Sequence, residues 1–244
     1  MKAIKAAGEL ILKGGKYSLD SADDTIHSNA NITISDGEFT LASGDDGIHA
    51  DSATTISGGT IDITESYEGI EGLSIDITGG ETYVSGPTND GNSALDYNGT
   101  GTVTGGIFIA AGSSGMAENF GDSSTQGVMM VTVNSQAAGS AVSLSDSSGN
   151  ELVSWTPEKE YTSVIISCPE ITTGQEYTLT TGSDTTQITM DSIVYGSGSG
   201  MGGNPGNGGG PGNGGDMGQK PDDGNGTGKG SGDGGNMGTP PEKS

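Results

Sequence analysis

The sequence contains no arginine, and its eight lysines face 32 acidic residues, which gives a formal net charge of -24. This shortage of positive charge argues against nucleic acid or an anionic membrane surface as a direct partner, since both attract basic proteins. Aromatic residues are also scarce, at 5%, and hydrophobic residues reach only 30%. So little apolar material disfavours a thick globular core and favours a thin one, built from many short strands.

Cysteine and long apolar runs are nearly absent as well. The single cysteine, Cys168, has no intramolecular disulfide partner, and we expect a small buried thiol. No segment approaches the ~20 consecutive apolar residues of a membrane-spanning helix, so membrane insertion is not expected. The N-terminal stretch also lacks the apolar segment and cleavage site of a signal peptide.

What the chain does contain is a repeat. The segments SADDTIHSN (21–29), SGDDGIHAD (43–51) and ESYEGIEGL (65–73) are versions of one motif, which we call the turn motif, and they recur with a 22-residue period. Asp90 follows Glu68 at the same interval, which predicts a fourth, weaker copy. A motif that recurs in the same chain direction at a fixed period indicates coils stacked on each other rather than a series of hairpins.

A second repeated unit lies between the copies of the turn motif. Each copy is a short alternating strand, a Gly-Gly or Asp-Gly turn and another alternating strand, which places one apolar row inward and one polar row outward. The copies occupy 10–19, 32–41, 54–63, 74–85 and 102–110. The sequence therefore predicts an all-β parallel β-helix with 22-residue coils over residues 1–127. Because the chain starts inside a repeat, we expect this β-helix to be N-terminally incomplete, with further coils and a leader upstream.

The pattern changes after the repeats. Residues 128–196 hold short strands without the 22-residue period, and we expect an antiparallel β cap or subdomain there. Trp155, the only tryptophan, lies in one of these strands and is a candidate sugar-stacking platform, although packing within the cap is the more common role. Residues 197–244, rich in Gly, Pro, Asn and Met, are predicted to be a disordered tail.

The residues of the repeat that could take part in chemistry are the acidic side chains of the turn motif. Stacking of coils about 4.8 Å apart would align Asp24, Asp46, Glu68 and Asp90, with Asp23 and Asp45 beside them. Carboxylates this close must splay into water, retain protons or bind a cation. Several hard oxygen ligands suit Ca²⁺, so we expect calcium in this column; a merely solvated acidic face is the alternative.

Two histidines recur with the same period. His27 and His49 each follow the aligned isoleucines by one residue, which predicts a stacked pair of rings. We expect this pair to face outward as an exposed or hydrogen-bonded ladder. A two-histidine metal site is the less favoured interpretation, because no dense nitrogen or sulfur cluster accompanies it.

The segments GDDGIHAD, SYEGIEG and ISGGTIDIT, with the later ELVSWTPEKEYTSVIIS, resemble the clostridial carbohydrate-binding β-helix family over about residues 1–196. The family is non-catalytic, related in fold to pectate lyases, and found on or outside Gram-positive cells. The resemblance implies a right-handed parallel β-helix, bound calcium, an extracellular or cell-surface location, and affinity for plant cell-wall polysaccharide, mainly acidic and pectin-like, with cellulose as a further candidate. The acidic positions that match the family are Asp23, Asp24, Asp45, Asp46, Glu68, Glu71 and Asp90.

Two other functions fit the same scaffold. A polysaccharide lyase or pectin hydrolase would need a basic residue beside Ca²⁺ or a unique pair of carboxylates. The chain has no arginine, and its Asp-Asp pair recurs in adjacent coils, so we expect no catalysis. A cell-surface adhesin or structural spacer is the second alternative, because the Ser- and Thr-rich outer faces are compatible with it.

Overall fold

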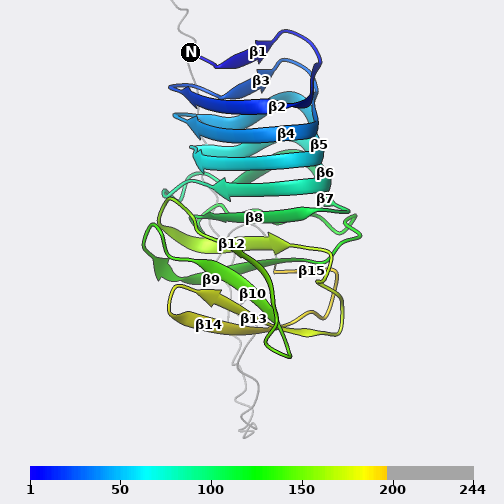
Figure 1. The fold of residues 1–244 in the computed structure, drawn as a ribbon, viewed down its shortest axis with the longest axis vertical. Helices are drawn as coiled ribbons and strands as arrows, with labels where there is room; N and C mark the ends of the chain where they lie inside the picture. Colours follow the sequence, from blue (N-terminus) through cyan, green and yellow to red (C-terminus); the bar gives the residue numbers. More distant parts are fainter. Residues whose placement is uncertain (197–244) are drawn as a thin grey trace, which may run out of the picture. The chain divides into compact units, whose positions relative to one another are not determined.

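The computed structural model describes residues 1–196, and these form a stack of β-coils followed by antiparallel strands (Figure 1). Five coils are built in order from the following strands: β1 (Ile4–Ala6), β2 (Leu10–Ser21), β3 (Ile26–Ser28), β4 (Ile32–Ser43), β5 (Asp46–Glu65), β6 (Glu68–Ser85), β7 (Leu95–Val103) and β8 (Ile107–Gly112). The described residues contain no helix, and so none that could cross a membrane. The predicted disordered tail, 197–244, lies outside the described residues.

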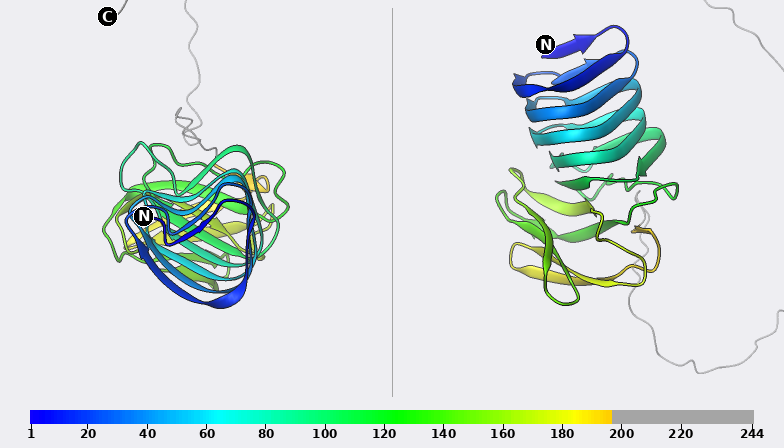
Figure 2. Two further views of the ribbon diagram at one scale, coloured as in Figure 1. Left: turned by 90° about the horizontal axis from the view of Figure 1, so that it is seen from above. Right: turned by 45° about the vertical axis from the view of Figure 1, so that its right-hand side comes forward.

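Register confirms the stacked coils of the prediction. Ile26 pairs in parallel with Ile48, and Ile48 pairs with Ile70, so the copies of the turn motif lie directly above one another with the predicted period. These three isoleucines are completely buried and form one internal row. The left view of Figure 2, which looks along the stack, shows the coils superposed. The core is therefore thin and repetitive, as the low hydrophobic content indicates.

Each coil turns a corner at a glycine, which lies within a continuous strand in β2, β4, β5 and β6 and between β7 and β8 in the last coil. Gly59 and Gly80 have φ angles of 86° and 80°, a region that side chains other than glycine rarely adopt. A Cβ at either position would also meet backbone atoms of the coil before it at less than 3.0 Å. Glycine is thus required at these Gly-Gly turns both by the backbone conformation and by the close approach of successive coils.

The strands after β8 pair antiparallel, except that β15 pairs in parallel with β9. They are β9 (Val128–Gln136), β10 (Val142–Asp146), β11 (Glu151–Trp155), β12 (Tyr161–Ser167), β13 (Glu176–Thr181), β14 (Asp184–Thr189) and β15 (Val194–Tyr195). Strand β12 pairs antiparallel with β8 of the last coil and with β9, so the sheet of the coils continues into this region. A second sheet, in the order β11-β10-β13-β14, is antiparallel throughout.

The two sheets enclose a second hydrophobic core. Met129, Ile166 and Leu179 are among its fully buried members, and Ile109 of the last coil also belongs to it. Cys168 is buried in the same cluster, as expected for the lone thiol. The all-β fold, the stacked coils and the antiparallel sheet are therefore as predicted. The proposed boundary between 127 and 128 stays a prediction, because strands on both sides of it share one sheet.

Candidate functional site

Two files of polar side chains run up the turn edge of the coils, three residues apart in each coil. The first file comprises Lys2, Asp24, Asp46 and Glu68, and the second comprises Lys5, His27, His49, Glu71 and Asp96. We call the two files together the acidic column. Their alignment follows from the buried isoleucine row between them, because side chains on either side of a paired residue inherit its register.

The first coils neutralise their own carboxylates. Asp24 is only 1% exposed and contacts the ammonium group of Lys2 and Nδ1 of His27, the latter at 2.7 Å. Lys2 also donates to Asp23 Oδ1 at 2.9 Å, and this hydrogen bond lowers the pKa of Asp23 to about 2. At this end of the acidic column, Lys2 provides the positive charge that the sequence interpretation assigned to calcium.

The histidines form the predicted hydrogen-bonded ladder. The ring centroids of His27 and His49 lie 4.8 Å apart, and His49 Nδ1 is 2.9 Å from Asp46 Oδ2 and 2.6 Å from Glu71 Oε2. Hydrogen bonding to Asp46, with the nearby carboxylates, raises the pKa of His49 to about 9. The expected outward exposure is wrong for His27, which is 6% exposed, because its ring packs between Asp24 and the ring of His49.

The later coils hold an excess of negative charge. Burial, with the neighbouring charge of Asp46, raises the pKa of Glu68 to about 7. Burial and Asp46 raise the pKa of Glu71 as well, and the pKa of Asp96 moves in the same direction for the same reasons. Among the residues described, no lysine makes an ion pair with these three carboxyl groups, and His49 is the one cation beside Glu71.

Asp46 carries an atom that nothing in the fold satisfies. Its side chain is buried, with 4% of the residue exposed, and its Oδ1 has no hydrogen-bond partner among the described residues. A buried carboxylate oxygen without a donor is costly, and native proteins usually satisfy it with a donor, a water or an ion. Ligand atoms of Asp46, His49 and Glu71 lie within 4.8 Å of one another, and the strand register places Glu68 beside Asp46 and Asp96 beside Glu71. The carboxylate oxygens of this group are ligands that Ca²⁺ prefers.

Asp90 lies outside the acidic column, contrary to the 22-residue prediction. Ile70 pairs with Leu95, which lies beyond the position that the regular period would give, so this coil is longer than those before it. The additional length falls in the turn at 88–93, where Asp90 accepts a hydrogen bond from the Ser113 hydroxyl. The register instead brings Asp96 beside Glu71, a position that sequence reasoning missed. The signal was present in SALD, which repeats the apolar-then-polar order of GIH and GIE.

The other predicted residues lie at the margin of this site. Asp45 is exposed, and one of its carboxylate oxygens lies within 4.8 Å of Asp23 and Asp24. Trp155 is half-buried on β11, where its ring stacks on Tyr83 with centroids 5.9 Å apart. This contact gives Trp155 the packing role favoured above. Its use as a sugar platform stays a prediction.

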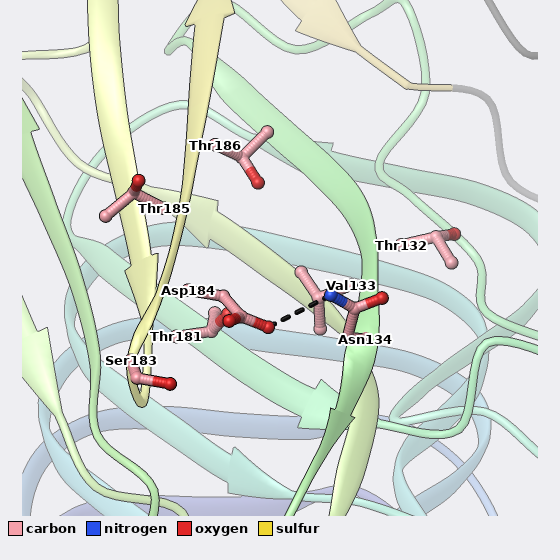
Figure 3. A pocket seen from close by; sticks show the side chains of 8 residues that line it. All are labelled: Thr132, Val133, Asn134, Thr181, Ser183, Asp184, Thr185 and Thr186. Carbon is pink, nitrogen blue, oxygen red and sulfur yellow. Dashed lines mark hydrogen bonds between the residues drawn. The ribbon is translucent and has the colours of Figure 1, made fainter.

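A separate polar hollow of about 540 Å³ lies between β9 and β14 (Figure 3). Hydroxyl groups dominate its lining, and Asn134 donates to Asp184 Oδ2 at 3.0 Å across it. Hydroxyl, amide and carboxylate groups of this kind can hydrogen-bond to a polar, uncharged ligand. The lining residues are Thr132, Val133, Asn134, Thr181, Ser183, Asp184, Thr185 and Thr186.

Comparison with known proteins adds one finding. Residues 1–47, from β1 into the first residues of β5, match the model of a family described as carbohydrate-binding domain-containing protein. No curated protein and no solved structure matches the chain. The matched segment includes Asp23, Asp24, Asp45 and Asp46, so it covers the first half of the acidic column. The similarity to this family supports a carbohydrate-binding role for the chain.

Proposed function

We propose that this protein is a non-catalytic binder of acidic, pectin-like plant cell-wall polysaccharide, that it needs Ca²⁺ to bind, and that it acts outside the cell or at its surface. The observation that carries the calcium requirement is the orphaned oxygen of Asp46, buried beside three carboxyl groups with raised pKa values. The family match over residues 1–47 supports the carbohydrate part.

The charge of the chain makes calcium part of the binding argument. A protein with a net charge of -24 repels a polyuronate unless a cation lies between them. A Ca²⁺ ion held by Asp46, Glu68, Glu71 and Asp96 would offset two of their four negative charges and retain coordination positions for uronate carboxylates. At the Lys2 end of the acidic column, the ammonium group of Lys2 contacts both Asp23 and Asp24, whereas His49 is shared between Asp46 and Glu71 in the later coils. We therefore assign calcium to the later coils only.

The test is binding of polygalacturonate, measured by calorimetry with calcium and again after excess EDTA, with cellulose as a neutral comparison. We expect binding in calcium and none in EDTA. A variant with Glu68→Gln and Glu71→Gln should lose both binding and the rise in melting temperature that calcium produces by linkage. Asp90→Asn is the matched control, since it removes one carboxylate of the same repeat from outside the acidic column.

Each alternative predicts a different result from the same experiment. Unchanged affinity in EDTA would contradict the bridging role of calcium. Steady release of unsaturated or reducing oligosaccharides would identify an enzyme. Absence of any polysaccharide binding in the presence of calcium would favour an adhesin or spacer.

A further inference from the structure

A second, smaller hollow lies beside the turns of the middle coils. Its volume is about 170 Å³, which is close to the size of one sugar ring, and turn residues of three successive coils line it together with Lys159. Tyr67, which directly precedes Glu68 of the acidic column, lies in its wall. We call this hollow the Lys159 pocket.

Lys159 is an isolated positive charge in a strongly acidic surface. It is the only lysine or arginine between Lys16 and Lys220. It lies in the 156–160 connection between β11 and β12, which reaches back across the coils. There its Nζ donates to the carbonyl of Ser66 at 2.8 Å, while Glu158 N donates to the Ser85 hydroxyl at 3.0 Å. Two contacts distant in sequence thus fix the ammonium group at the pocket.

The ammonium group has no carboxylate within ion-pair distance in the described part of the chain, unlike Lys2 and Lys16. Burial lowers the pKa of Lys159, and the nearby charge of Glu65 only partly opposes this. A half-buried ammonium with one hydrogen bond keeps two unused donors, and a second acceptor would offset its desolvation. A carboxylate is the acceptor that fits this charge best.

Tyr67 provides the apolar element of the pocket. Its side chain is 50% exposed, and it is the one aromatic residue among 1–196 that reaches so high an exposure. Its backbone is nevertheless fixed, because Tyr67 N donates to the Asp45 carbonyl at 2.7 Å. An exposed ring on a fixed backbone, beside polar groups, is a suitable surface for the C–H face of a sugar. Thr88 and Asn89 add hydrogen-bonding groups at the rim.

From this arrangement we infer that the Lys159 pocket holds one uronate residue of the polysaccharide, with its carboxylate on Lys159 and its ring against Tyr67. The inference rests on the proposed function and extends it to a contact that does not involve calcium. The pocket adjoins the acidic column through Tyr67 and Glu68, so one polymer would meet an ammonium group and a calcium site in succession.

The test compares Lys159→Met and Tyr67→Ala with the unaltered protein for binding of oligogalacturonate in saturating calcium. A charge-assisted hydrogen bond contributes roughly 1.5–3 kcal/mol, so Lys159→Met should weaken binding by roughly tenfold or more. Tyr67→Ala should weaken it as well, whereas Tyr67→Phe, which keeps the ring, should not. Lys16→Met is the matched control for lost charge, because Lys16 pairs with Glu38 on the first coils.

Two further measurements separate the possible failures. The calcium-induced rise in melting temperature should be the same in Lys159→Met as in the unaltered protein. On the unaltered protein, oligogalacturonate should shift the NMR amide signals of Ser66 and Tyr67, a result that needs no variant to fold. Wild-type affinity in Lys159→Met, or unshifted signals, overturns the pocket while calcium-dependent binding stands. Absence of binding by the unaltered protein overturns the proposed function and the pocket together.

Discussion

At the scale of single residues, the acidic column combines two solutions to one electrostatic problem. Asp24 contacts the ammonium group of Lys2 from the adjacent coil and the ring of His27 from its own coil. Glu68 forms no ion pair in the described residues, Glu71 has only His49, and the pKa values of both carboxyl groups are raised. The change occurs at Asp46, which shares His49 with Glu71 and leaves one oxygen unpaired.

This arrangement predicts how stability depends on pH without calcium. Glu68 and His49 both have folded-state pKa values above the ordinary ones, about 7 against 4.5 and about 9 against 6.5. Each therefore binds its proton more tightly in the folded chain, and the stability it contributes is lost as pH rises through the folded value. The free energy of unfolding should fall from about pH 5 to about pH 9 in urea titrations.

Calcium should oppose this fall, because it binds the ionised carboxylates. The stabilisation by calcium should grow over the lower part of the same pH range, as Glu68 and Glu71 lose their protons. Glu68→Gln is the control, since it removes one of the titrating groups and should flatten the profile of the calcium-free protein below about pH 7. A calcium-free protein that gains stability toward alkaline pH would contradict this account.

At the scale of the coil, the period of the repeat could be predicted wherever the interior requires it. The rows of buried isoleucine and the Gly-Gly corners recur at close to one interval because each coil must pack on the one before it. No such constraint acts on an exposed turn. The turn at 88–93 is longer, the Asp90 prediction consequently failed, and Asp96 took the adjoining position in the column.

Gly69, the glycine inside the third copy of the turn motif, provides a test of this packing. A Cβ at Gly69 would lie 2.2 Å from the Ala94 carbonyl oxygen and 2.4 Å from Val84 Cγ1, so backbone would have to move. Gly69→Ala should lower the free energy of unfolding in urea by about 1–3 kcal/mol. Gly8→Ala, where a Cβ would meet nothing within 4 Å, should be neutral or slightly stabilising. Equal effects of the two substitutions would contradict close coil packing at Gly69.

At the scale of the whole molecule, the net charge of -24 destabilises the folded chain through self-repulsion. Salt screens this repulsion, since the Debye length falls from ~10 Å at 0.1 M to ~3 Å at 1 M. The melting temperature of the calcium-free protein should therefore rise with NaCl concentration. Calcium should achieve the same rise at concentrations too low to screen, and a magnesium control at equal ionic strength should achieve less. Equal responses to calcium and magnesium would favour screening over a site.

The antiparallel pairing of β12 with β8 also limits how molecules can associate. A parallel coil offers its neighbour an edge running in the same direction, and on such an edge identical units can add without end. Here the last coil is already paired with a strand of opposite direction, and a hydrophobic sandwich covers it. Copies therefore cannot polymerise into a fibre by adding parallel strands at this end.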